Sequence, residues 1–225
     1  ERWKEPSRPL GMEMQTRVRK DRLPSFHEHS QSDKRAICLH RFAGHELLAV
    51  EIMAFALLSF PEAPKQFRRG LSNTLKEEQE HVRLYMQRME EMGLRFGDLP
   101  LYRHFWVHTP SMTSPLNYIS TMCLTLEMAN LDFAPMYGDS FEKNKDFASA
   151  DLMKRILTDE ISHVGFGMNW LKKMKKPGQT DWEAWIETLS PFSHPARARG
   201  CFVQEEYRLA AGVSPEWIEK IKAYR

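Results

Sequence analysis

The chain has 225 residues, which is long enough for one domain with a sizeable core. Its 32 Lys and Arg residues nearly balance its 30 Asp and Glu residues, so the net charge of +2 gives no reason to expect nucleic acid or an anionic membrane as a partner. The longest apolar stretch, residues 49–60, is too short to span a membrane, and no secretory segment is visible. Three isolated cysteines do not form a disulfide framework, so we expect a cytoplasmic protein.

The first part of the chain divides into an arm and two helices. Residues 1–32 are polar, rich in Arg and Pro and without apolar periodicity, which predicts an extended N-terminal arm. From Asp33, which suits an N-cap position, apolar residues recur at helical spacing as far as Pro61. A second helix is predicted from Pro64 to Gly93, because glycine is typical of the position after a helix.

A long connection separates the second helix from the third. Residues 94–113 are rich in aromatic side chains and make a connection of 20 residues, which is long for a compact domain. The pair Ser114–Pro115 suits the N-cap and first position of a third helix, which Pro135 is expected to end or kink. A fourth helix is predicted from about Ser149 to the basic run 172–176.

Four long helices with one long crossover predict an all-α fold, a ferritin-like four-helix bundle. We expect the bundle at residues 33–176, between the arm at 1–32 and a C-terminal helical extension at 177–225 that packs on the bundle. Within the extension, a short helix is predicted near 201–211, and Ser214 followed by proline is expected to begin a last one.

Two Glu-x-x-His motifs are the main chemical signal in the sequence. Glu78 and His81 on the second helix, and Glu160 and His163 on the fourth, stand three residues apart and therefore share a helix face. Roughly one such motif is expected by chance in this composition, so the motif alone does not identify a site. The surroundings are more specific, because one glutamate interrupts an apolar stripe on each of the four helices. These residues are Glu46, Glu78, Glu127 and Glu160, with 32 residues from the first to the second and 33 from the third to the fourth.

Metal binding explains four inward carboxylates better than a purely structural role does. Ionised glutamates in an apolar core are very costly unless their charge is compensated, and two divalent cations would cancel four negative charges. Neutral His81 and His163 would complete the coordination, and carboxylates with imidazoles suit iron or manganese better than zinc. Glu51 also lies among apolar residues on the first helix and competes with Glu46, although the matched spacings favour Glu46.

This pattern, over about residues 33–176, resembles the ferritin-like di-iron carboxylate superfamily. The Pro-Phe-Ser-x-x-Ala-Arg stretch at 191–197 is similar to the tail of an uncharacterised bacterial ferritin-like family, domain of unknown function 455, for which no reaction is known. The resemblance implies two iron ions, with manganese as an alternative at either position, and bridging roles for Glu78 and Glu160. Its implied ligands are Glu46, Glu78, His81, Glu127, Glu160 and His163.

The resemblance also nominates residues around the ligands. Asp159 would hydrogen-bond His81 and Glu77 would hydrogen-bond His163, unless both carboxylates are simply solvated, and Glu51 would be an additional inward carboxylate. Tyr85 has the offset from His81 of a radical tyrosine in ribonucleotide reductase small subunits, but a core tyrosine is the favoured interpretation. Gly167, after His163, either leaves space at the site or permits close helix packing. The arm and crossover histidines are expected to be surface or packing residues: His27, His29, His104 and His108.

From the site we expect a non-haem di-iron, or iron and manganese, oxidoreductase that uses dioxygen to oxidise or hydroxylate a small organic molecule. The arm, crossover and extension favour an enzyme, because such segments can cover a pocket. One alternative is a metal-handling ferroxidase without an organic substrate. Another is a hydroxylase of a modified tRNA base, supported only by a basic patch at Arg17, Arg19, Lys20 and Arg22. The electron donor cannot be predicted, and an enzyme of this kind would be a monomer or homodimer.

Overall fold

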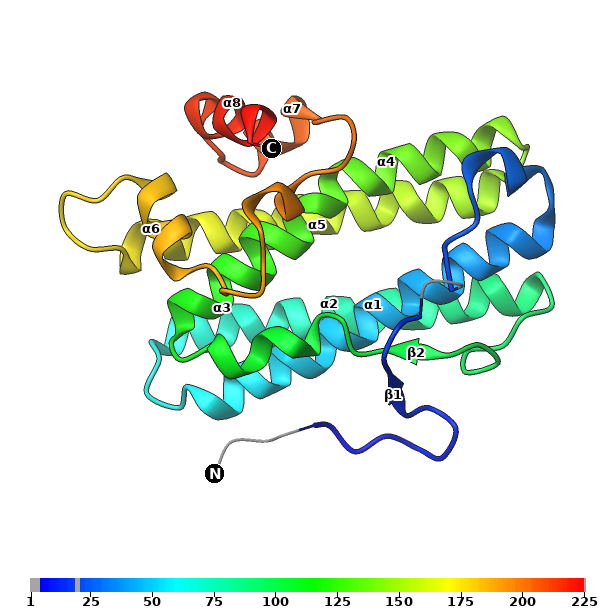
Figure 1. Cartoon of the computed structure of the whole chain (residues 1–225), viewed down its shortest axis with the longest axis horizontal. Coiled ribbons are helices and arrows are strands. Elements are labelled where there is room, and N and C mark those ends of the chain that lie inside the picture. Colours follow the sequence, from blue (N-terminus) through cyan, green and yellow to red (C-terminus); the bar gives the residue numbers. More distant parts are fainter. Residues whose placement is uncertain (1–4, 19–20, 225) are drawn as a thin grey trace. The chain divides into compact units, whose positions relative to one another are not determined.

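The computed structural model describes residues 5–18 and 21–224, and these residues are mostly helical, which confirms the predicted all-α class (Figure 1). The long helices are α1 (Ser32–Ser59), α2 (Lys65–Glu91), α4 (Met128–Lys143) and α5 (Phe147–Met174). The shorter ones are α3 (Pro115–Thr121), a π-helix (Met122–Glu127), α6 (Asp181–Thr188), α7 (Glu205–Ala210) and α8 (Pro215–Ala223).

The chain forms two compact units, and α2, α4 and α5 contribute residues to both. The first unit comprises Glu1–Pro61, Leu71–Val107 and Gly138–Leu152. The second comprises Glu62–Gly70, His108–Tyr137 and Met153–Arg225. The arrangement of the long helices as a ferritin-like bundle remains a prediction.

In the first unit the N-terminal arm is held by backbone pairing. Strand β1 (Met14–Gln15) pairs in parallel with strand β2 (Leu101–Tyr102), which belongs to the long connection after α2 (Figure 1). A 3-10 helix (Phe26–Ser30) then leads into α1. Within the described residues, this pairing joins the arm to the connection.

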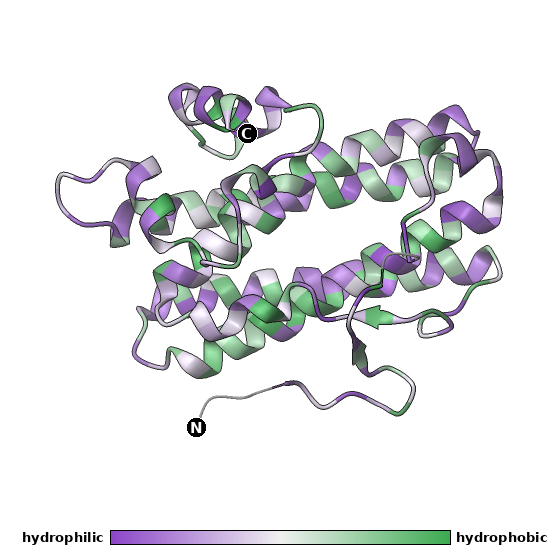
Figure 2. Ribbon diagram, in the orientation of Figure 1, coloured by the Kyte–Doolittle hydropathy of each residue, from purple (hydrophilic) through white to green (hydrophobic). Residues whose placement is uncertain are grey.

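Helix α1 carries a large share of the first unit's core. Apolar residues run along it between polar ones (Figure 2), and its buried residues include Leu39, Leu48 and Ile52. Its N-cap is Gln31, not Asp33 as predicted, and Asp33 lies in the first turn, where a carboxylate interacts favourably with the helix dipole. Among the described helices α1 has the length and hydropathy of a membrane span, but this is a weak indication because core helices of soluble proteins share it.

The third long helical segment begins in α geometry as α3, passes through the π-helix and continues as α4. The Ser114 hydroxyl accepts the Asn117 N–H at 3.2 Å, so α3 begins where the sequence predicted. The π-helix and α4 follow without a break, and α4 continues through Pro135 to Lys143. Of the two outcomes predicted for Pro135, an end of the helix is wrong, and a kink stays a prediction. Proline removes one N–H donor from the helix, but the chain stays helical on both sides of Pro135.

The described C-terminal part of the second unit contains the short helices α6, α7 and α8, a 3-10 helix (Pro195–Ala198) and a buried ion pair. The predicted helix near 201–211 is α7, and the predicted helix after Ser214 is α8. Helix α6 begins with a capping box between Thr180 and Glu183. Arg208 on α7 is fully buried and donates to the Asp132 carboxylate of α4 at 2.9 Å.

Candidate metal centre

Each unit contains one buried group of two glutamates and one histidine. In the first unit these are Glu46 on α1 and Glu78 and His81 on α2, here called the first trio. In the second unit they are Glu127, at the end of the π-helix, and Glu160 and His163 on α5, here called the second trio. Within each trio the potential ligand atoms lie within 4.8 Å of one another. The six predicted ligands therefore fall into two sets of the same composition.

The distances within each Glu-x-x-His motif suit two ligands of one ion. His81 Nδ1 lies 3.3 Å from Glu78 Oε2, and His163 Nδ1 lies 3.6 Å from Glu160 Oε2. Both separations exceed the usual N–H···O distance of about 2.7–3.2 Å. Two donors each about 2.1 Å from a metal ion stand roughly 3.0–3.6 Å apart at bond angles of 90–120°. The motifs are thus spaced for coordination better than for direct hydrogen bonding.

The buried carboxylate of Glu160 gives the clearest indication that this part of the chain binds a cation. Its side chain is 0% exposed, and Asn130 donates to its Oε1 at 2.9 Å. Its other oxygen, Oε2, is buried and makes no hydrogen bond within the described part of the chain. A buried carboxylate oxygen without a hydrogen bond is unfavourable. A cation at the second trio fits this oxygen, and the oxygen and imidazole donors suit iron or manganese.

A contact from the N-terminal arm distinguishes Glu46 from Glu51, the two candidate metal ligands on α1. Arg8 donates to both carboxylate oxygens of Glu51, at 2.7 and 2.6 Å. This bidentate pair occupies Glu51 and satisfies its charge. Glu46, which is 4% exposed, is the α1 carboxylate that lies with Glu78 and His81. This pairing could not be predicted, because Arg8 lies in a segment without apolar periodicity.

The other nominated residues differ in burial. Glu77 is exposed and Asp159 is half-buried. The hydrogen bonds expected of them would join residues of different units, and they remain predictions. Tyr85 is 1% exposed, with its ring centroid 5.9 Å from that of Phe42, as expected for a core tyrosine. Asn130 was not singled out by the sequence, although it stands three residues after Glu127 and thus on a neighbouring part of the same helix.

The arm and crossover histidines have packing partners. His29 is buried, with Nδ1 2.7 Å from the Ser140 hydroxyl, and His108 is buried, with Nδ1 2.9 Å from the Ser190 hydroxyl. His104 lies edge-on to His45, with ring centroids 4.8 Å apart. His27 is exposed. The interpretation of these residues as surface or packing groups agrees with these contacts.

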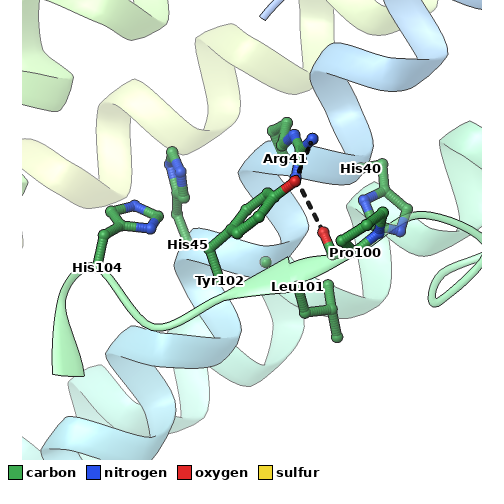
Figure 3. A pocket seen from close by; sticks show the side chains of 8 residues that line it. His40, Arg41, His45, Pro100, Leu101, Tyr102 and His104 are labelled. Carbon is green, nitrogen blue, oxygen red and sulfur yellow. Dashed lines mark hydrogen bonds between the residues drawn. The ribbon is translucent and has the colours of Figure 1, made fainter. Parts of the chain in front are cut away.

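A small hollow beside β2 in the first unit is lined by polar and apolar residues of α1 and the connection (Figure 3). Arg41 donates to the Pro100 carbonyl at 2.9 Å and to the Tyr102 hydroxyl at 3.0 Å, and its guanidinium lies over the Tyr102 ring. His40 accepts the Gly97 N–H at 3.1 Å, and burial lowers its pKa to about 4. These contacts join α1 to the connection. Packing between these two segments therefore explains the polar side chains at the hollow.

The fold and the two trios define an all-α protein with candidate metal-binding residues. The chain belongs to the family described as "Protein of unknown function (DUF455)", whose model matches residues 1–219. It is also 25% identical over 205 residues to an uncharacterised protein of Haemophilus influenzae (strain ATCC 51907 / DSM 11121 / KW20 / Rd), which covers 83% of this chain and 68% of the relative. No solved structure shows significant similarity to the chain. Neither comparison provides a reaction.

Proposed function

We propose that this chain is a dinuclear metal oxidoreductase of the ferritin-like type, with iron as the favoured metal and manganese as the alternative. The observation that carries this proposal is the matched pair of buried trios, each with two glutamates and one histidine. Two trios supply four carboxylates, whose charge two divalent cations would cancel, and two imidazoles that add no charge when neutral. Residues Glu78 and Glu160 are proposed as bridging ligands between the two ions.

The protein's own residues would hold and shield the metal ions. When bound, two ferrous ions close together supply two electrons to dioxygen. Glu46, Glu78 and Glu160 are 4%, 0% and 0% exposed, so bulk water has little access to these carboxylates. The Asn130 amide fixes the orientation of Glu160 by donating to Oε1. A ligand set that is shielded from bulk water in this way would favour controlled oxidation of one bound organic molecule.

An oxidase and an iron-storage protein differ in how much iron each chain holds. We expect the full chain, loaded with excess ferrous iron in air, to retain two iron ions per chain and to remain a monomer or a dimer. Light scattering and elemental analysis of the same sample measure both quantities. A large hollow oligomer that takes up many iron ions per chain would contradict the oxidase and support the metal-handling alternative.

The tRNA alternative depends on the basic patch of the N-terminal arm and stays an untested alternative. Arg17 and Arg22 are exposed, and Arg17 donates to the Asp21 carbonyl at 3.1 Å. Arg19 and Lys20 lie outside the described residues. A small organic substrate and a cytoplasmic location remain part of the proposal.

A further inference from the structure

The helix that carries Glu127 changes from α to π geometry at Met122, and Glu127 is the last residue of the π-helical part. The π-helix spans Met122–Glu127, and all six of its residues are buried. A π-helix bonds residue i to i+5 and contains an additional residue per turn; it is rare and frequently found at functional sites. One additional residue rotates the following part of a helix by about 100°. The direction of the Glu127 side chain therefore depends on whether this turn keeps its π geometry.

The π-helix Met122–Glu127 is here called the π-turn. Two side chains donate hydrogen bonds to the Ser120 carbonyl just before it. The Thr125 hydroxyl donates to the Ser120 carbonyl at 2.7 Å, across the same five-residue interval as a π-helical bond. The Trp185 indole of α6 donates to the same carbonyl at 3.1 Å and contacts the Thr125 hydroxyl at 3.0 Å. Trp185 is fully buried, so these bonds are protected from water. A carbonyl covered by two such donors is well satisfied in the π geometry.

Helix α5 leaves space for this wide turn at one glycine. A Cβ atom on Gly167 would lie 2.6 Å from Cys123 Cβ and 3.0 Å from Leu124 Cδ2, both on the π-turn. Gly167 follows His163 by one helical turn, so the helix that carries two members of the second trio also contacts the turn that carries the third. The absence of a side chain at Gly167 permits this close approach.

On the basis of the metal-binding role proposed above, we propose that Thr125 and Trp185 lock the π-turn and thereby position the Glu127 carboxylate within the second trio. These two are positioning residues, because neither contributes a ligand atom to the trio. This gives the C-terminal extension a role at the metal centre, since α6 supplies Trp185. Gly167 is the complementary element that gives the turn its space.

Titration with Co²⁺, followed by visible absorption, tests this role in the full chain. Thr125→Val removes the hydroxyl with little change in volume, and we expect at least one Co²⁺ to bind about 10–100-fold more weakly. Trp185→Phe should act in the same direction, and Thr125→Ser, which keeps the hydroxyl, should restore the affinity. Thr121→Val is the matched control, because the Thr121 hydroxyl accepts the Ser190 N–H at 3.2 Å and does not bond the π-turn. Unchanged Co²⁺ affinities in Thr125→Val and Trp185→Phe would overturn the inference.

A second measurement separates this inference from the proposed function. In the metal-free chain, NMR couplings across hydrogen bonds distinguish i to i+5 from i to i+4 bonding in Met122–Glu127. We expect π-type couplings in the original chain and in Thr125→Ser, and their loss in Thr125→Val. If the original chain binds no Co²⁺, the proposed function fails, while these couplings still decide the lock. If Thr125→Val keeps the π-type couplings, the lock is wrong whatever the metal binding.

Discussion

On α1, Glu46 lies with Glu78 and His81, whereas Glu51 pairs with Arg8 of the N-terminal arm. Glu46 and Glu51 both interrupt apolar stripes, and the matched spacings were the only basis for choosing between them. The structure separates them through Arg8, a residue 43 positions away that pairs with Glu51. This contact joins the N-terminal arm, which has no apolar periodicity, to a helix. No local sequence pattern therefore predicts it. The six ligand candidates could be predicted because each depends on the periodicity of its own helix.

Two buried histidines make the stability of the protein depend on pH. Burial lowers the pKa of both His40 and His108 from 6.5 to about 4. Below pH 6.5 the unfolded chain binds protons at these imidazoles that the folded chain does not bind until about pH 4, so stability is lost as the pH falls through this window. The loss is up to roughly 3 kcal/mol for each histidine.

Urea unfolding at pH 7, 5.5 and 4 measures this dependence. Between pH 7 and pH 4, we expect the free energy of unfolding to decrease less for His40→Gln than for the original chain. The matched control is His27→Gln, because His27 is exposed. The same decrease in His40→Gln and in the control would show that His40 is not responsible.

At the scale of elements, helix starts could be predicted where capping chemistry is local. Ser114 and Ser214 precede prolines, and both hydroxyls accept a backbone N–H three residues later. Helix α6 was missed, although the Thr180 and Glu183 capping box was a signal for it. The π-helix could not be predicted, because it depends on Trp185 and Gly167, which lie on other helices.

The ion pair between Asp132 and Arg208 should contribute strongly to the stability of the second unit. Asp132 also accepts the backbone N–H groups of Gly200 and Gln204, at 2.8 and 2.7 Å, so one carboxylate fastens the C-terminal segment to α4. Removing one partner of a buried pair leaves an uncompensated charge, which costs about 3–5 kcal/mol. We therefore expect Arg208→Met to lower the free energy of unfolding by that amount, measured by denaturant titration.

An exposed arginine provides the control for this variant. Arg83 pairs with Glu80 on α2, with 61% of the Arg83 side chain exposed, and surface pairs contribute about 0–1 kcal/mol. Arg83→Met should therefore have little effect. A loss for Arg208→Met no larger than that of Arg83→Met would contradict the role of the buried pair.

At the scale of the whole molecule, the chain repeats one chemical unit. Each compact unit holds a Glu-x-x-His motif on one helix and a single glutamate on another. The nearly equal spacings in the sequence follow from this repetition, and they explain why the candidate site could be predicted in spite of an unremarkable composition. The covering segments could not be predicted in the same way, because their contacts are not periodic.

The central claim is that the two trios bind two metal ions, and metal content tests it most directly. After chelator treatment and reloading with ferrous iron under anaerobic conditions, we expect elemental analysis to find two ions per chain. His81→Ala and His163→Ala should each retain at most one, and Glu78→Ala with Glu160→Ala should retain none. The controls His27→Ala and Glu80→Ala should retain two, because His27 is exposed and Glu80 pairs with Arg83. Two ions per chain in the double glutamate variant would contradict the account.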